Sequence, residues 1–146
     1  MTGYVVGASV AVKWLVEEVH SDRAATLLDG GPTLVAPPLL FAETANALWA
    51  MRRRGDMAAA DLADAVETLR GAPVSTPLSM AEHMAAATRL AHDLDHPVYD
   101  CFYLALALHA QYPVVTADTR FFDKVYGHPY LSDRVVHLAD IPAPEM

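Results

Sequence analysis

Residues 4–15 read "YVVGASVAVKWL", and this stretch decides the fold class. Tyr4–Val6 is a short apolar run rich in β-branched side chains, which predicts a strand. The residues from Ser9 to about Glu18 place apolar side chains at helical spacing, with Ser9 as a candidate N-cap. A strand that passes directly into a helix is the first half of a β-α-β unit. The first question is therefore whether the remainder of the chain repeats this alternation.

The remainder does alternate between short apolar strands and amphipathic helices. Such a pattern predicts a mainly parallel sheet covered on both faces, and we expect one α/β domain over residues 1–146. Two caps are expected, at Asp56 and at the Ser79/Glu82 capping box. The predicted strands are 33–36, 113–118 and 134–138, with an edge strand at 73–77; the predicted helices are 21–30, 37–54, 56–70, 79–96, 97–111 and 119–125.

Composition narrows the class of protein. The 146 residues are 53% hydrophobic, 19% charged and carry a formal net charge of −8, which argues against a broad basic face for nucleic acid. A net negative charge of this size either keeps the protein soluble or reflects a cluster of carboxylates that binds cations. The single cysteine, Cys101, favours a reducing compartment. No apolar run is long enough to cross a membrane and no signal peptide is evident, so we expect a cytoplasmic protein.

Three acidic residues stand where ligands bind in a parallel sheet, beyond the carboxyl ends of the strands. Asp118 follows the apolar run "PVVTA", Glu43 lies early in a helix, and Asp100 interrupts a helix that is otherwise apolar. Each has a local alternative: a helix N-cap for Asp118, and an acid favoured near a helix start for Glu43 and Asp100. Together they predict an oxygen-rich site for Mg²⁺ or Mn²⁺.

Four motifs carry a resemblance to a known family. They are "YVVGASVAVKWL", "PPLLFAETANALW", "PVYDCFYLALA" and "PVVTADTRFF", in this order along nearly the whole chain. In these motifs the chain resembles the VapC-type PIN-domain toxins, the ribonuclease halves of type II toxin–antitoxin pairs. The resemblance implies an α/β/α sandwich and Mg²⁺- or Mn²⁺-dependent cleavage of RNA. It also implies a VapB-type antitoxin as partner, a homodimer, and a heterotetramer or larger assembly with that antitoxin.

The resemblance assigns roles to individual residues. Glu43, Asp100 and Asp118 match three of the family's four acidic positions, and Ser9 and Thr116 match hydroxyls that support them. An auxiliary acid at Asp123 is possible under the resemblance, although a solvated helix residue is the more ordinary interpretation.

Position 7 departs from the family pattern. Family members read Asp-x-Ser at the end of the first strand, whereas this chain reads Gly7-Ala8-Ser9. Gly7 thus stands where a metal-ligating aspartate is expected. A deliberate inactivating substitution, a natural loss of activity, and a simple requirement for glycine in a tight turn are three explanations. We favour inactivation of one kind or the other, because the surrounding motifs still match, and expect the chain to be inert or crippled.

Basic and histidine residues receive weaker assignments. Arg52-Arg53-Arg54 at the end of a predicted helix either offset its dipole or contact phosphate, and Lys13 and Arg120 are further candidates for RNA contact. His92 and His96 are interpreted as a solvated helix end rather than a Zn²⁺ pair.

Two other functions remain open. A catalytically dead PIN-like module would only bind antitoxin or RNA. A receiver-like domain with an acidic Mg²⁺ pocket is disfavoured, because the first strand ends without paired acids.

Overall fold

A four-stranded parallel sheet lies at the centre of the computed structural model, which describes residues 2–145. The strand order is β2-β1-β3-β4, so the chain begins in the interior of the sheet and ends at one edge. In register, Val5 pairs with Val35 on one side and with Val114 on the other. The strands are β1 Gly3–Val6, β2 Thr33–Val35, β3 Val114–Thr116 and β4 Val135–His137.

Helices connect every pair of consecutive strands. Two short helices lie between β1 and β2, four longer ones between β2 and β3, and one between β3 and β4. The α-helices are α1 Ala8–Ala11, α2 Ser21–Thr26, α3 Leu39–Arg53, α4 Ala59–Arg70, α5 Met80–Leu94, α6 Val98–Ala110 and α7 Thr119–Tyr126; single 3₁₀ turns are η1 Val12–Trp14, η2 Ser132–Arg134 and η3 Leu138–Asp140.

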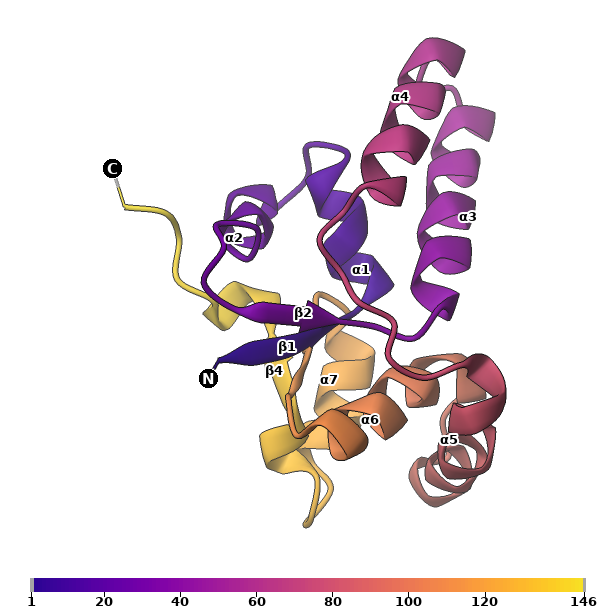
Figure 1. Cartoon of the computed structure of the whole chain (residues 1–146), viewed down its shortest axis with the longest axis vertical. Helices are drawn as coiled ribbons and strands as arrows, with labels where there is room; N and C mark the ends of the chain where they lie inside the picture. The colour runs from indigo at the N-terminus through magenta and orange to yellow at the C-terminus, as the bar shows by residue number, and fades with distance from the viewer. Residues whose placement is uncertain (1, 146) are drawn as a thin grey trace.

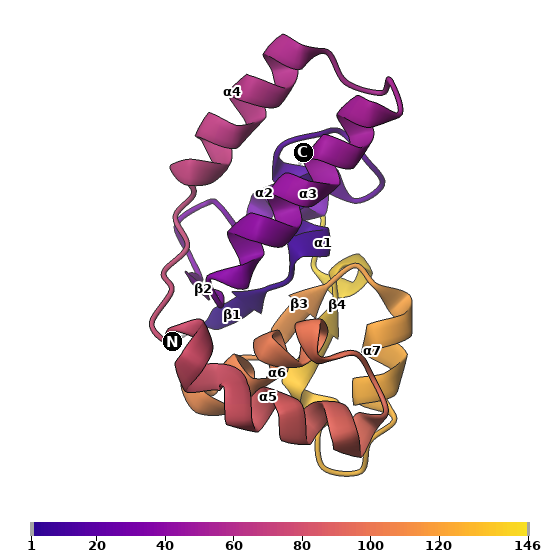
Figure 2. The ribbon, with the colours of Figure 1, turned by 90° about the vertical axis from the view of Figure 1, so that its right-hand side faces the viewer.

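The helices form layers on both faces of the sheet. Figure 1 shows α1 and α2 above the strands and α5 and α6 below them, while α3 and α4 form a hairpin that extends away beside α1. Figure 2 shows the same separation from the side, with α7 next to β3 and β4. This is an α/β/α sandwich with an all-parallel sheet, as the alternation of strands and helices predicted.

Helix α6 is the central element of the lower layer. Its residues from Cys101 to Ala107 are all buried, and their apolar side chains surround the helix on every side. A helix of that composition is stable only inside a core, where it packs here against β1 and β3. The polar Asp100 stands one residue before this buried segment, in the first turn of α6.

Several predicted boundaries were wrong. The helix after β1 ends at Trp14 rather than at Glu18, and Ser9 lies inside α1, whose N-cap is Gly7. The next helix ends at Thr26, well before residue 30. Helix α4 is capped by Ala58 and not by Asp56.

The expected edge strand at residues 73–77 is reduced to one bridge, between Val35 and Ser75. Prolines 73 and 77 flank the bridge and limit the ladder, because proline donates no backbone hydrogen bond. The capping box of α5 is confirmed: Ser79 accepts from the Glu82 N–H, and the Glu82 carboxylate accepts from the Ser79 N–H.

Among residues 2–145, no helix combines the length and the apolar character needed to span a membrane.

Candidate functional site

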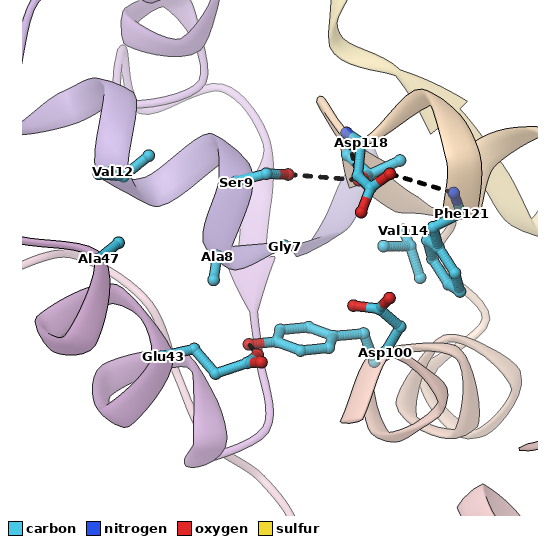
Figure 3. A pocket seen from close by; sticks show the side chains of 12 residues that line it. Gly7, Ala8, Ser9, Val12, Glu43, Ala47, Asp100, Val114, Asp118 and Phe121 are labelled. Carbon is cyan, nitrogen blue, oxygen red and sulfur yellow. Dashed lines mark hydrogen bonds between the residues drawn. The ribbon is translucent and has the colours of Figure 1, made fainter. Parts of the chain in front are cut away.

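A cavity of about 250 Å³ opens at the carboxyl ends of β1 and β3, where the first turns of α1, α6 and α7 converge. Figure 3 shows the carboxylates of Glu43, Asp100 and Asp118 around this space, each carried by a different helix or helix cap. Parallel strands end at the same side of a sheet, so side chains that follow them are brought together there. The lining residues are Gly7, Ala8, Ser9, Val12, Glu43, Ala47, Asp100, Tyr103, Val114, Thr116, Asp118 and Phe121.

Gly7 forms the junction between β1 and α1. Its φ of −75° and ψ of 151° are extended values that any residue adopts, so the turn itself imposes no requirement for glycine. A Cβ at this position would lie 3.1 Å from the Val115 carbonyl oxygen, a contact so close that the backbone must shift by a few tenths of an ångström to admit it. The same Cβ would lie 3.7 Å from the Ser9 hydroxyl, on the cavity wall. Position 7 therefore accepts a short side chain only if the backbone at Val115 moves slightly.

Ser9 and Thr116 link the two strand ends beneath the cavity. The Ser9 hydroxyl accepts the Ala117 N–H at 2.9 Å, and the Thr116 hydroxyl accepts the Asp118 N–H at 3.0 Å. Both hydroxyls thus support the backbone of the loop that carries Asp118. Support of the carboxylates by these two hydroxyls stays a prediction, since both bonds are to backbone N–H groups.

Asp118 is also the N-cap of α7. Its Oδ1 atom accepts the N–H groups of Arg120 at 3.0 Å and Phe121 at 3.2 Å. The local alternative for this acid is therefore correct, and it is compatible with the cavity position, because the cap uses one carboxylate oxygen. Within the described residues, Oδ2 has no hydrogen-bond partner.

Glu43 is held by a buried tyrosine. The Tyr103 hydroxyl donates to Glu43 Oε1 at 2.7 Å, across the gap between α6 and α3. Partial burial raises the pKa of Glu43, the Tyr103 hydrogen bond opposes that rise, and the Asp100 charge adds to it. Burial raises the pKa of Tyr103, and the carboxylates of Glu43 and Asp100 raise it further. Tyr103 therefore stays a protonated donor, whereas Glu43 is an acid that a nearby cation would help to ionise.

Asp100 is held by a histidine from the preceding loop. His96 Nε2 lies 2.6 Å from Asp100 Oδ2, and the His96 side chain is only 10% exposed. The interpretation of His96 as solvated was therefore wrong, whereas His92 is exposed as expected. Cys101, next to Asp100, is buried, and burial raises the pKa of its thiol to about 11, so it behaves as an inert apolar residue.

The donor chemistry of the cavity suits a hard divalent cation. Each of the three carboxylates has one oxygen without a protein partner among residues 2–145. In the same described range, no three histidine, cysteine, aspartate or glutamate side chains lie close enough to ligate one ion together. Mg²⁺ retains several waters and takes one or two carboxylates, so the present residues fit a hydrated ion better than a closed protein cage.

Other predicted site residues lie outside the cavity lining. Asp123 is exposed on α7, in agreement with a solvated helix residue. The three arginines at positions 52–54 are at the far end of α3, more than two helical turns beyond Glu43. Lys13 pairs with Glu18 at 3.4 Å. Arg120 is exposed two residues after Asp118.

Two polar residues of the site were missed in the sequence. Tyr103 follows Asp100 by three positions, a spacing that places both on one helix face, but it was absorbed into an apolar run. His96 precedes Asp100 by four positions, which is helical spacing as well. Pro97 between them, at the N-cap of α6, suggested a helix end exposed to water.

A family model for the PIN domain matches residues 4–127. No curated protein sequence is similar enough to count as a match.

Solved structures with the same fold cover most of the chain at low sequence identity. A protein called PAE2754 from Pyrobaculum aerophilum superposes with a TM-score of 0.67 and 20% identity, covering 94% of this chain and 90% of its own. VapBC2 from Rickettsia felis, bound to a DNA fragment from its promoter, gives 0.63 and 14%, covering 92% and 97%. Mycobacterium tuberculosis VapC20, described as a sarcin-ricin loop cleaving toxin, gives 0.59 and 15%, covering 78% and 87%.

Proposed function

The chain belongs to the PIN-domain family, and we propose that it is the toxin of a type II toxin–antitoxin pair, built as a metal-dependent endoribonuclease and disabled by Gly7. The observation that carries this proposal is the cavity at the ends of β1 and β3. It gathers Glu43, Asp100 and Asp118 around a backbone position that presents no side chain. The description of a similar protein, VapC20, as a sarcin-ricin loop cleaving toxin supports the choice of RNA as substrate class.

The roles of the residues follow from their contacts. Glu43, Asp100 and Asp118 would hold a hydrated Mg²⁺ or Mn²⁺, with one or two of the carboxylates as direct ligands and the rest bonded to the waters of the ion. When bound, the ion polarises the phosphodiester and lowers the pKa of a water molecule. Tyr103 keeps Glu43 in place, Ser9 and Thr116 keep the Asp118 loop in place, and the apolar lining at Val114 and Phe121 limits water.

The missing carboxylate explains why activity should be low. An aspartate at position 7 would place its Cβ near Ser9, on the wall of the cavity that Glu43, Asp100 and Asp118 also line. Its loss lowers the affinity for the ion and removes charge stabilisation in the transition state, effects worth orders of magnitude in rate.

Gly7→Asp tests the proposal directly. The parent, Gly7→Asp and the neutral isostere Gly7→Asn are incubated with total cellular RNA, with Mg²⁺, Mn²⁺ or a chelator. We expect cleavage by Gly7→Asp alone, lost with the chelator and in Gly7→Asp combined with Asp118→Asn. A folded Gly7→Asp protein that binds Mn²⁺ yet cleaves no RNA would overturn the nuclease assignment.

We also propose a VapB-type antitoxin as partner, with a homodimer that forms a heterotetramer or larger complex. Toxin–antitoxin complexes from Klebsiella pneumoniae and Rickettsia felis share the fold. Co-expression with the product of an adjacent short reading frame, followed by size-exclusion chromatography with light scattering, tests this. A chain that stays free of that product, and monomeric, would contradict it.

The runner-up function is a binding module without catalysis. Gly7 favours it, since the chain as it stands lacks one ligand. The same Gly7→Asp assay separates the two functions: a module that never was a nuclease gains no cleavage from the substitution.

A further inference from the structure

The loop between α5 and α6 holds its backbone in a fixed conformation. Asp95, the C-cap of α5, adopts a left-handed φ of 49°, and the N–H of the following residue, His96, bonds to the Ala91 carbonyl at 3.1 Å. Pro97 then fixes the entry into α6. The position of His96 is thus set by α5, while its side chain points across to α6.

The His96 ring contacts two walls of the cavity. Its Nε2 atom lies 2.6 Å from Asp100 Oδ2. Its ring centre is 5.3 Å from that of Phe121, which lines the cavity and belongs to α7. The His96 side chain is only 10% exposed, so its imidazole packs against Asp100 and Phe121 and is largely shielded from water.

Helix α7 clamps the same loop. The Lys124 ammonium donates to the carbonyls of Leu94, at 3.1 Å, and of Asp95. One helical turn earlier, Phe121 donates its N–H to Asp118 Oδ1. Helix α7 therefore contacts the His96 loop through Lys124 and the His96 ring through Phe121. The backbone N–H of Phe121 also bonds to Asp118.

From these contacts we infer that His96 is a positioning residue, which fixes the orientation of Asp100 relative to Asp118. Asp100 is 36% exposed and its only hydrogen-bonded side-chain partner among the described residues is His96. Without that bond, the carboxylate would turn toward water. With it, one oxygen is held by His96 and the other is left free for the cavity. The inference deepens the proposed function and rests on it for the identity of the ion.

Three variants distinguish a residue that orients Asp100 through a hydrogen bond from one that only occupies space in the packed interior. His96→Leu keeps the bulk of the side chain and loses the hydrogen bond, whereas His96→Gln retains an Nε donor. His92→Leu, on the exposed face one turn earlier in α5, is the matched control.

Crystal structures of the variants give a readout that needs no metal and no activity. We expect Asp100 to leave its position in His96→Leu, and to keep it in His96→Gln and His92→Leu. An Asp100 carboxylate that stays in place in His96→Leu would overturn the inference.

Mn²⁺ titration by calorimetry, in the parent and in the Gly7→Asp background, gives the second readout. His96→Leu is expected to weaken Mn²⁺ binding about tenfold, the lower end of the range for residues that orient a ligand, while His96→Gln recovers most of the loss. Equal affinities in all variants would count against the inference. Failure of Gly7→Asp to cleave RNA would overturn the proposed function and leave both readouts standing.

Discussion

The hydroxyl of Ser9 lies 3.3 Å from that of Thr116, although 107 residues separate them in the chain. This contact joins the junction of β1 and α1 to the junction of β3 and α7. Since each hydroxyl also accepts a backbone N–H from the loop ending at Asp118, the pair fixes one wall of the cavity before any ligand arrives.

Ser9→Ala should therefore destabilise the protein more than an ordinary serine substitution. It leaves the Ala117 N–H without its acceptor, which costs roughly 1–2 kcal/mol. Thermal unfolding followed by circular dichroism measures the loss. Ser132→Ala, at an exposed serine in η2, is the control and should unfold within a degree or so of the parent. Equal unfolding temperatures for Ser9→Ala and Ser132→Ala would show that the hydrogen bond to the Ser9 hydroxyl does not stabilise the fold.

Substitutions at position 7 should be tolerated by the fold. Gly7 occupies the N-cap of α1, where glycine, asparagine and aspartate differ by only a few tenths of a kcal/mol and alanine is worse by about 1 kcal/mol. We expect Gly7→Asn to match the parent in chemical denaturation and Gly7→Ala to fall below it. Gly7→Asp should gain stability from Mn²⁺ more than Gly7→Asn does. A collapse of all three variants would mean that the 3.1 Å approach to Val115 is prohibitive.

Glu43→Gln should stabilise the protein at neutral pH. Burial raises the pKa of Glu43 above its usual 4.5, so the folded state holds the proton more tightly than the unfolded state. Below the unfolded value both states are protonated and no penalty exists; as pH rises through the folded pKa, stability is lost. Urea denaturation at about pH 4 and about pH 7 measures the difference, which should appear only at the higher pH. An equal difference in unfolding free energy between Glu43→Gln and the parent at both pH values would contradict a raised pKa of Glu43 in the folded state.

Arg120→Ala should weaken RNA binding more than removal of any one arginine from positions 52–54. Arg120 is exposed beside Asp118, whereas Arg54 already pairs with Asp56 at 3.1 Å and Arg53 lies over the Trp49 ring. Loss of one phosphate contact lowers the salt dependence of binding by about one unit in slope. Fluorescence anisotropy over a range of salt checks this, with Arg70→Ala on α4 as control. An unchanged slope for Arg120→Ala would place the RNA elsewhere.

Local patterns predicted the parts of the fold that depend on neighbours in sequence. The run "PVVTAD" became β3 and the cap of α7, and Ser79 with Glu82 became a capping box, because period-2 and capping signals act within a few residues. Ser9 shows where this reasoning ends. It lies inside α1, whose N-cap is Gly7, and its hydroxyl accepts a backbone N–H more than a hundred positions away.

The candidate site shows the same limit. The three carboxylates were proposed from the sequence because ligands bind beyond the carboxyl ends of parallel strands. The hydrogen-bond partners of these carboxylates became visible only in the packed structure. His96 meets Asp100 at helical spacing, but Pro97 between them suggested a helix end exposed to water. Tyr103 on α6 meets Glu43 on α3, sixty positions away, and spacing gives no sign of that contact.

The walls of the cavity come from α3, α6 and α7, which are widely separated stretches of the polypeptide. A chain that ends before α7 lacks the wall that carries Asp118, and one that ends before α6 also lacks Asp100. The cleft therefore exists only after nearly the whole polypeptide has been made and has folded.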